Sequence, residues 1–513
     1  MYKKNDYYDN RGLIFAMDKI RILQIGDVDW QSKYVIPDSI KLVFCPDKIK
    51  KEKQVYEIVV LERNLTEEEA EIIHAMSMAY SVFTIEGFEM DGVTKALFER
   101  RLGKVLREDE VQYFLDNEAR NYYAVPYGEK FKPAQIGVAQ GFKGSIKWNG
   151  QYSVSLDGEY GEELNQIAFW RNNIPINKGQ AIELWLEYKK EPDITISLSI
   201  KQFVSGSLAD VLESWDFSEE ELNSPVIIEG TKGQGPIFCS LKASGRGKLD
   251  IIALHDRYSR RGNGVFLVGG QRHVTSKREE IFSYFDPGDL KPPMAVYFSG
   301  YKTQEGFEGY WMMRKMGCPF LLIAEQRFEG GGFYMGDSEF EDLMVSIIDS
   351  HLNKLGFYPD QLILSGISMG TIGSMYYGCD LKPHALILGK PLASLGDIAA
   401  NERLNRPKGF PTSLDLLHHY GGGMDKNAIR ALNDRFWNKI RNTDFSHTKF
   451  IVSYMFEDDY DDTAYNKLLS ELNSAGVQVY GKGLHGRHND NTAGIAAWFK
   501  GQYERVLKDD FDR

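Results

Sequence analysis

Six short, almost continuously apolar segments in the C-terminal part of the chain constrain its fold most. They begin at residues 294, 319, 361, 384, 449 and 477 and read MAVYFSGY, PFLLIAEQR, QLILSGIS, HALILGKP, KFIVSYMFED and VQVYGKGL. Helical segments at 338–355, 371–377, 463–475 and 492–507 separate most of them. Strands that are apolar on both faces need cover on both sides, and alternating strands and helices give a parallel sheet with right-handed crossovers. Residues 286–513 are therefore predicted to form an α/β domain.

One interval in this domain is too long for a simple crossover. It runs from about 395 to 443, between the fourth and fifth predicted strands. We expect it to form a helical cap or lid over the C-terminal ends of the strands.

The preceding part of the chain has a different pattern. Residues 1–130 mix short apolar strands with a helix that opens at Thr66 on a capping-box sequence, T-E-E-E, and reaches about Tyr80, which predicts a small α/β region. Residues 131–285 are a succession of alternating apolar and polar runs, up to GVFLVGG at 264–270, separated by Gly, Asn, Asp and Pro turns. That pattern predicts an antiparallel β-sandwich.

Three tryptophans make carbohydrate binding an option for the predicted sandwich. Sugar rings stack on exposed aromatic faces, and the candidates are Trp148, Trp170 and Trp185. The alternative for each of them is a place in the apolar core.

Composition excludes several classes of protein. A net charge of −12 over 513 residues argues against a nucleic-acid-binding protein. No apolar run reaches the roughly 18 residues that a membrane-spanning helix needs, and the first 26 residues have no leader pattern. The cysteines are far apart, without C-x-x-C spacing, which favours reduced thiols in a cytosol over disulfides or a zinc site; they are Cys45, Cys239, Cys318 and Cys379.

Ser368 stands in a Gly-x-Ser-x-Gly sequence, from Gly366 to Gly370. The pentapeptide alone is weak evidence, but here it follows an apolar strand and precedes a helix of small residues. This is the strand–turn–helix arrangement of a nucleophilic serine in α/β hydrolases, where glycines leave room for a sharp turn. We interpret Ser368 as the candidate nucleophile.

A serine nucleophile needs a base and an orienting acid, which follow it in the order acid, then histidine, in α/β hydrolases. The strand KFIVSYM ends in an acidic cluster, within which we favour Asp458 and keep Glu457 and Asp459 as alternates. The loop after the last strand carries two histidines, of which we favour His488 as the base and keep His485 as the alternate.

An oxyanion hole would complete such a site. The backbone N–H of Met369 is one predicted donor, and the Gly300–Tyr301 region, after the first strand of the domain, supplies the second. Residues 329–333, Glu-Gly-Gly-Gly-Phe, end another strand on the same rim. They are interpreted as a turn, with a substrate or anion site as the alternative.

The remaining histidines do not predict a metal site. His418 and His419 are adjacent, so on a helix they point about 100° apart. The others have no ligand spacing, and they are His74, His255, His273, His351, His384 and His447.

Taken together, the motifs resemble a known family. RILQIGDVDW, SGISMGTIGSMYYG, YMFEDDYDD and HGRHNDNTAG are similar to the second of the accessory secretion proteins of the accessory Sec system in Gram-positive cocci, over nearly the whole chain. Members help to export serine-rich-repeat glycoprotein adhesins. The resemblance implies a hydrolase-like triad with Ser368 as nucleophile, an acid at Asp458 and His488 as base.

The resemblance also implies the reaction and its setting. It implies O-acetylation of N-acetylglucosamine on the adhesin, a complex with two other accessory Sec proteins, and delivery to the accessory Sec motor ATPase. No bound cofactor is expected, and acetyl-CoA is the expected acetyl donor. The expected location is cytoplasmic, with a peripheral position at the inner face of the membrane left open. A serine esterase or deacetylase and a non-catalytic export adaptor are the alternatives.

Overall fold

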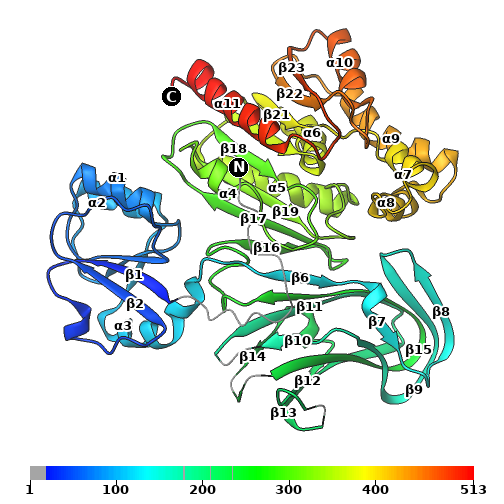
Figure 1. The fold of residues 1–513 in the computed structure, drawn as a ribbon, viewed down its shortest axis with the longest axis horizontal. Coiled ribbons are helices and arrows are strands. Elements are labelled where there is room, and N and C mark those ends of the chain that lie inside the picture. Colours follow the sequence, from blue (N-terminus) through cyan, green and yellow to red (C-terminus); the bar gives the residue numbers. More distant parts are fainter. Residues whose placement is uncertain (1–18, 177–178, 208, 231, 234) are drawn as a thin grey trace. The chain divides into compact units, whose positions relative to one another are not determined.

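The computed structural model describes residues 19–513, apart from 177, 178, 208, 231 and 234. The predicted lack of a leader concerns residues that lie mostly outside the described ones. The chain forms two compact units, of which the first ends at Val125 and the second begins at Pro126 (Figure 1). The expected boundary at 130 falls slightly late, because β6 (Gly128–Phe131) already pairs with the β-rich part of the second unit.

The described part of the first unit is a five-stranded parallel sheet with helices, in the strand order β2-β1-β3-β4-β5. The Thr66 hydroxyl accepts the Glu69 N–H, and the Glu69 carboxylate accepts the Thr66 N–H at 3.0 Å, so the predicted capping box is present. The helix it opens ends at Met76, earlier than predicted. The elements are β1 (Ile20–Ile25), β2 (Ile40–Cys45), β3 (Ile58–Leu61), α1 (Glu67–Met76), β4 (Val82–Ile85), α2 (Gly92–Arg100), β5 (Lys104–Leu106) and α3 (Val111–Tyr113).

The second unit begins with an antiparallel β region, as predicted. Ten strands of described residues form one hydrogen-bonded sheet that encloses a single apolar core. They are β6, β7 (Ile136–Val138), β8 (Lys143–Asn149), β9 (Ser153–Trp170), β10 (Ile174–Ile176), β11 (Ala181–Lys190), β12 (Ile194–Phe203), β13 (Val211–Ser218), β14 (Val226–Glu229) and β15 (Gly235–Tyr258).

The long strand β15 holds this region together. Its first half pairs with β12 and its second half with β11, while β9 follows both halves with several register shifts. Gly245 and Gly247, between the two halves, have φ of +93° and +131°, which side chains rarely adopt. Glycine therefore allows the strand to change direction and sheet partners there.

One predicted strand of this region is wrong. Residues 264–270 form turns instead, because Gly264 and Phe266 have φ of +128° and +61°, which extended strands do not allow. The N–H of Val265 closes the loop by donating to the carbonyl of Gly270 at 3.0 Å.

The rest of the second unit is the predicted α/β domain. Its described strands form an eight-stranded sheet in the order β16-β17-β19-β18-β20-β21-β22-β23, with β18 to β23 parallel. The strands are β16 (Gln271–Val274), β17 (Glu280–Asp286), β18 (Met294–Phe298), β19 (Phe320–Glu325), β20 (Leu362–Ile367), β21 (Ala385–Gly389), β22 (Lys449–Met455) and β23 (Val479–Leu484).

The boundary predicted at 286 is wrong, since β16 and β17 precede it and belong to this sheet. Both pair antiparallel, β17 with β19 and β16 with β17, so their sequence resembles the preceding antiparallel strands. The helices are α4 (Tyr310–Arg314), α5 (Ser338–Leu355), α6 (Met369–Leu381), α7 (Leu395–Leu404), α8 (Thr412–Gly421), α9 (Lys426–Arg441), α10 (Ala464–Ser474) and α11 (Thr492–Phe511). Helices α7, α8 and α9 fill the interval predicted to be a helical lid, between β21 and β22 (Figure 1).

Candidate active site

Ser368 lies on a strained turn between β20 and α6. Its φ and ψ are 57° and −120°, a conformation that costs a residue with a side chain on the order of 1–3 kcal/mol. The Ser368 N–H donates to the carbonyl of Gly389, at the end of the neighbouring strand β21, at 2.8 Å. The serine side chain is only partly buried, so a substrate can reach it. This is the geometry of a nucleophile elbow.

The glycines beside Ser368 are required by space. A Cβ on Gly366 would lie 2.3 Å from the carbonyl carbon of Gly370, and one on Gly370 would lie 2.1 Å from the carbonyl oxygen of Phe298. One turn later, a Cβ on Gly373 would lie 2.6 Å from the Phe298 ring. The sharp turn and the close packing of α6 on β18 therefore exclude larger residues at all three positions.

The structure brings Ser368, His488 and Asp458 together. The Ser368 Oγ lies 2.8 Å from the Nε2 of His488, and the His488 Nδ1 lies 2.8 Å from the Oδ2 of Asp458. The other Asp458 oxygen accepts the N–H groups of Tyr460 and Asp461 at 2.9 and 3.2 Å. His488 and Asp458 are buried, at 3% and 9% exposure.

Asp458 is suited to carry a negative charge. Burial alone would raise the pKa of this carboxyl, but the hydrogen bond and charge of His488 and the two backbone N–H donors outweigh it, so the pKa is lowered from its ordinary value. An ionised Asp458 accepts the Nδ1–H of His488, which leaves Nε2 free to accept the proton of Ser368.

The alternate residues lie differently. Glu457 and His485 pair with each other at 3.0 Å on the surface, whereas the Ser368 hydroxyl hydrogen-bonds to His488. Asp459 is exposed, and its Oδ1 accepts the backbone N–H of His488 at 3.0 Å. Asp459 thus supports the histidine loop, while Asp458 alone among the three carboxylates contacts the imidazole.

The predicted oxyanion donors divide into two groups. Met369 begins α6, where a backbone N–H has no partner inside the helix, and Tyr301 N–H donates to none of the described residues. The Gly300 N–H donates to the Glu308 carboxylate at 2.7 Å and is therefore occupied. Met369 and Tyr301 thus remain the candidate pair of donors.

An aromatic cluster with one member from the lid packs against His488, and sequence reasoning missed it. Phe410, between α7 and α8, is 7% exposed, and its ring lies 5.0 Å from Tyr301, 5.6 Å from Phe333 and 5.8 Å from Tyr460. The Tyr460 ring lies 4.7 Å from His488. Tyr460 belongs to the YMFEDDYDD motif, so its position after the acidic cluster was a usable signal.

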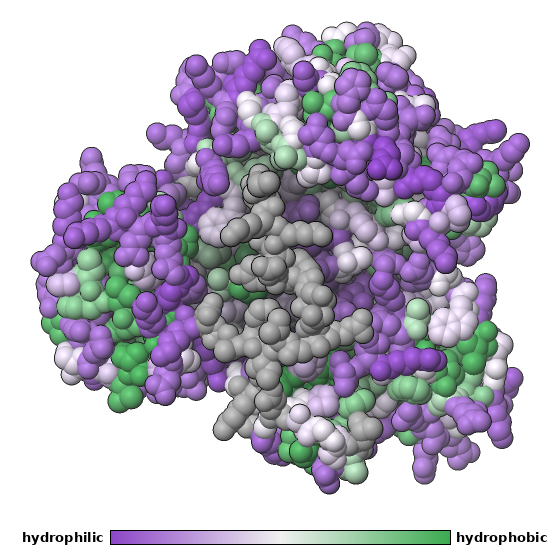
Figure 2. Space-filling model, viewed as in Figure 1, coloured by the Kyte–Doolittle hydropathy of each residue, from purple (hydrophilic) through white to green (hydrophobic). Residues whose placement is uncertain are grey.

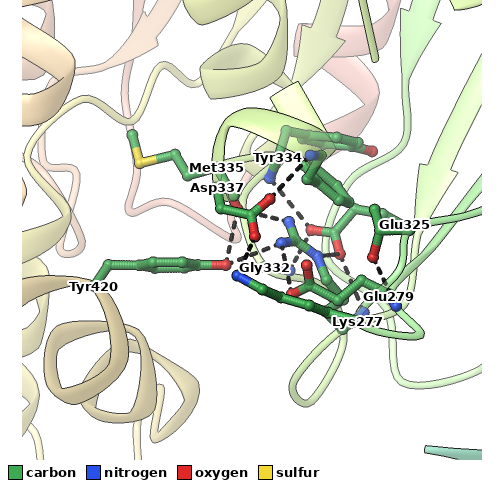
Figure 3. A network of polar contacts seen from close by, with 12 residues as sticks. Lys277, Glu279, Glu325, Gly332, Tyr334, Met335, Asp337 and Tyr420 are labelled. Atoms are coloured by element: carbon green, nitrogen blue, oxygen red, sulfur yellow. Dashed lines mark hydrogen bonds and ion pairs between the residues drawn. The ribbon is translucent and has the colours of Figure 1, made fainter. Parts of the chain in front are cut away.

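The loop from 326 to 336 is fixed by a polar network (Figure 3). The Glu325 carboxylate accepts the N–H groups of Gly332 and Tyr334, and the Tyr334 hydroxyl donates to the carbonyl of Ser299 at 2.7 Å. Within this loop, a Cβ on Gly331 would lie 2.6 Å from the Met369 side chain. The Glu-Gly-Gly-Gly-Phe sequence is therefore an ordered turn that packs against Met369, the residue after Ser368.

Two of the three candidate sugar-stacking tryptophans belong to the core. Trp170 and Trp185 are each 2% exposed, and Trp185 packs beneath the guanidinium of Arg278 at 3.9 Å. Trp148 on β8 is 48% exposed, beside Ile146 at 46%, where hydrophobic side chains gather on the surface (Figure 2). A sugar-stacking role is possible only for Trp148 and stays a prediction.

One group among the described residues has the spacing of a metal site. Ligand atoms of Glu187, His255 and Glu280 lie within 4.8 Å of one another. Glu280, however, already accepts hydrogen bonds from Arg257 at 2.6 and 2.8 Å, and Lys130 lies 3.5 Å from Glu187. These cations neutralise the carboxylates, so we interpret the group as an ion-pair network between the β region and the α/β domain.

The comparisons with known proteins agree with this architecture. The family described as the Accessory Sec system GspB-transporter matches residues 20–513. The chain belongs to this accessory Sec family. An accessory Sec system protein of Streptococcus gordonii is 38% identical over 509 residues, covering 97% of this chain and 99% of that protein. The Staphylococcus aureus protein of the same name is 41% identical over 387 residues, 75% of this chain and 74% of the relative.

A solved structure extends the agreement to the fold. A chain of the Glycosylation Associate Protein (Gap123) complex from Streptococcus agalactiae is 36% identical, with a TM-score of 0.84, and covers 97% of this chain and 100% of that chain. The resemblance predicted from the motifs is therefore confirmed, and the chain is a protein of the accessory Sec secretion system. Among the described residues, every helix is too short or too polar to cross a membrane.

Proposed function

We propose that this accessory Sec protein is a serine-dependent O-acetyltransferase that acts on N-acetylglucosamine of an exported serine-rich-repeat adhesin. One observation carries the proposal: Ser368, His488 and Asp458 form a continuous chain of hydrogen bonds on an elbow at the C-terminal end of a central strand. The proposed donor is acetyl-CoA.

The proposed chemistry has two halves. His488 Nε2 takes the hydroxyl proton while the Ser368 oxygen bonds to the acetyl carbon, and the N–H groups of Met369 and Tyr301 hold the oxyanion. The carbon–sulfur bond breaks, and His488 gives its proton to the leaving thiolate. In the second half, His488 removes the proton of a sugar hydroxyl, whose oxygen takes the acetyl group and releases Ser368, which regains its proton.

The lid supports transfer over hydrolysis. A sugar hydroxyl and water compete for the same acyl-enzyme, so exclusion of water favours the acetyltransferase. The Tyr460 ring packs against His488, and Phe410 from the lid packs against Tyr460. The guanidinium of Arg406 stacks 4.0 Å above the Tyr460 ring. Arg406 also donates to the carbonyl of Asp459, which ties the lid to the loop that carries the acid.

The proposed setting follows from the family. The S. agalactiae relative comes from a complex, which supports a complex of this chain with two other accessory Sec proteins. The adhesin and the motor ATPase are proposed as further partners, in the cytoplasm or at the inner face of the membrane. A serine esterase or deacetylase and a non-catalytic adaptor are the competing functions.

Replacing Ser368 by Ala tests the proposal. Adhesin from cells with this variant is analysed for glycan acetylation by mass spectrometry, and its export is measured in parallel. Exposed Ser346 on α5 supplies the control, Ser346→Ala. Loss of acetyl groups only in Ser368→Ala supports the transferase; acetylation that persists refutes it. Extra acetylation would favour the deacetylase, and lost export with unchanged acetylation would favour the adaptor.

A further inference from the structure

A large cavity lies away from the triad, within the second unit. It has a volume of about 850 Å³ and is formed by the end of β11, the turn between β16 and β17, the start of α5 and the lid helices α8 and α9. Neither Ser368, Asp458 nor His488 lines it. The volume is in the range that holds a small organic ligand.

The cavity is positively charged in an acidic protein. Its lining carries five cationic and three acidic side chains, while the chain as a whole has a net charge of −12. The cations are Lys189, Lys190, Lys277, Arg278 and Arg435, and the acids are Glu219, Glu279 and Asp337. Such a local excess attracts anions.

Several of these cations are already engaged. Lys190 pairs with Glu219 at 3.0 Å, and Arg435 pairs with Glu341 at 2.7 Å. Arg278 is held by the carbonyl of Leu186 at 3.1 Å and stacks on buried aromatic rings. These three side chains stabilise the fold, so we do not assign them to a ligand.

Lys189 and Lys277 remain accessible to a ligand. Lys189 is exposed, and among the described residues its ammonium contacts the Tyr152 hydroxyl, at 3.4 Å, and no carboxylate within 4.0 Å. Lys277 pairs with Asp337, but the lysine is 56% exposed and the aspartate 32%. An exposed pair of this kind contributes little and exchanges readily. Figure 3 shows Lys277 and Asp337 beside Tyr420, and all three residues line the cavity.

His419 on α8 lines the same cavity. Partial burial, followed by the charges of Lys189 and Arg327, lowers the pKa of His419 to about 4. The imidazole is therefore neutral at physiological pH and can donate one hydrogen bond to an anion.

We propose that this cavity binds the phosphate group of a small phosphorylated molecule, held by Lys189 and Lys277 with His419 beside them. Two ammonium groups match a phosphate as point charges, and rings such as Tyr420 line the remaining space. The phosphate can belong to a free nucleotide-like compound or to a lipid headgroup. Both sources present the same phosphate oxygens to the two lysines.

The test measures binding to the full-length chain by calorimetry at low salt. The probes are coenzyme A, inorganic pyrophosphate, and phosphatidylcholine vesicles with and without phosphatidylglycerol. The double variant Lys189→Gln/Lys277→Gln is compared with Lys482→Gln/Lys508→Gln, which removes the same charge from exposed surface elsewhere. We expect the first pair to weaken binding at least about ten-fold and the second to leave it unchanged.

The outcomes separate the sources and the alternatives. Binding of coenzyme A or pyrophosphate supports a free phosphorylated compound, and binding of phosphatidylglycerol vesicles alone supports a headgroup. Equal binding by both double variants, or no binding of any probe at millimolar concentration, overturns the proposal. Coenzyme A is also the product of the proposed donor at Ser368, so only the part of its binding that Lys189→Gln/Lys277→Gln removes counts for this cavity. Pyrophosphate carries no acyl group for Ser368, so its binding tests the cavity independently of the acetyltransferase proposal.

Discussion

Replacing Asp458 by Asn removes the charge beside the imidazole of His488 with little change in volume. The Asp458 Oδ2 lies 2.8 Å from the His488 Nδ1, and the side chain is 9% exposed, so water cannot replace it. An amide in this place can donate to Nδ1, which leaves the proton on Nε2 and prevents His488 from accepting the proton of Ser368. We expect the rate constant for acylation of Ser368 to fall about 10⁴-fold, or roughly 5 kcal/mol in activation free energy.

The assay is the single-turnover release of p-nitrophenol from p-nitrophenyl acetate, with circular dichroism to confirm folding. Glu457→Gln should keep nearly full activity, because Glu457 is 53% exposed and faces His485. Asp459→Asn weakens only the hydrogen bond from the His488 backbone, at 3.0 Å, and should cost about ten-fold or less. If Glu457→Gln or Asp459→Asn abolishes activity while Asp458→Asn retains it, the assignment of the acid is refuted.

Three further predictions concern packing, pH and the lid. Gly370→Ala should lower the free energy of unfolding by about 3 kcal/mol, because its Cβ would lie 2.1 Å from the Phe298 carbonyl oxygen. Gly501→Ala, with open space around the new Cβ, should not lower it. Equal stability of the two variants in urea unfolding refutes the packing argument. Burial raises the pKa of Asp415 to about 6 from 3.8, so the folded state holds the proton more tightly and its stability falls as pH rises through this window. The free energy of unfolding of Asp415→Asn, relative to that of the wild type, should therefore rise by up to about 3 kcal/mol between pH 4 and pH 7. A difference in unfolding free energy that stays constant with pH contradicts this. Phe410→Ala should raise the ratio of released acetate to acetylated acceptor by opening the site to water, and an unchanged ratio removes Phe410 from water exclusion.

Much of the fold and of the site followed from local patterns. Strands β18 to β21 and most of β22 are buried on both faces, so their apolar runs could be recognised without tertiary information. Ser368, Asp458 and His488 follow the ends of β20, β22 and β23, and the carboxyl ends of parallel strands meet at one edge. Their proximity was therefore predictable from chain order.

Other features depend on contacts that leave no local pattern. Asp458, rather than its neighbours, turns inward because its carboxylate accepts the N–H groups of Tyr460 and Asp461. The Gly300 N–H is occupied because the chain returns to bring Glu308 against it. Phe410 is one aromatic residue in a loop, and only the folded lid places it over the site.

The prediction of a domain boundary at residue 286 was wrong for a related reason. Strands β16 and β17 pair antiparallel, so nothing in their sequence distinguishes them from the preceding β region. Similarly, Trp185 alternates along β11 like an exposed residue, but Arg278 from the turn after β16 covers it.

The acyl-enzyme itself tests the central claim most directly. The full-length protein is mixed with an acetyl donor, quenched in acid within milliseconds to seconds, and examined by intact-protein and peptide mass spectrometry. The proposed chemistry predicts a gain of one acetyl group, located on Ser368, that is absent in Ser368→Ala and disappears when an N-acetylglucosamine acceptor is added to the wild type. An acetyl group on another residue, or acetyl transfer that continues in Ser368→Ala, would contradict it.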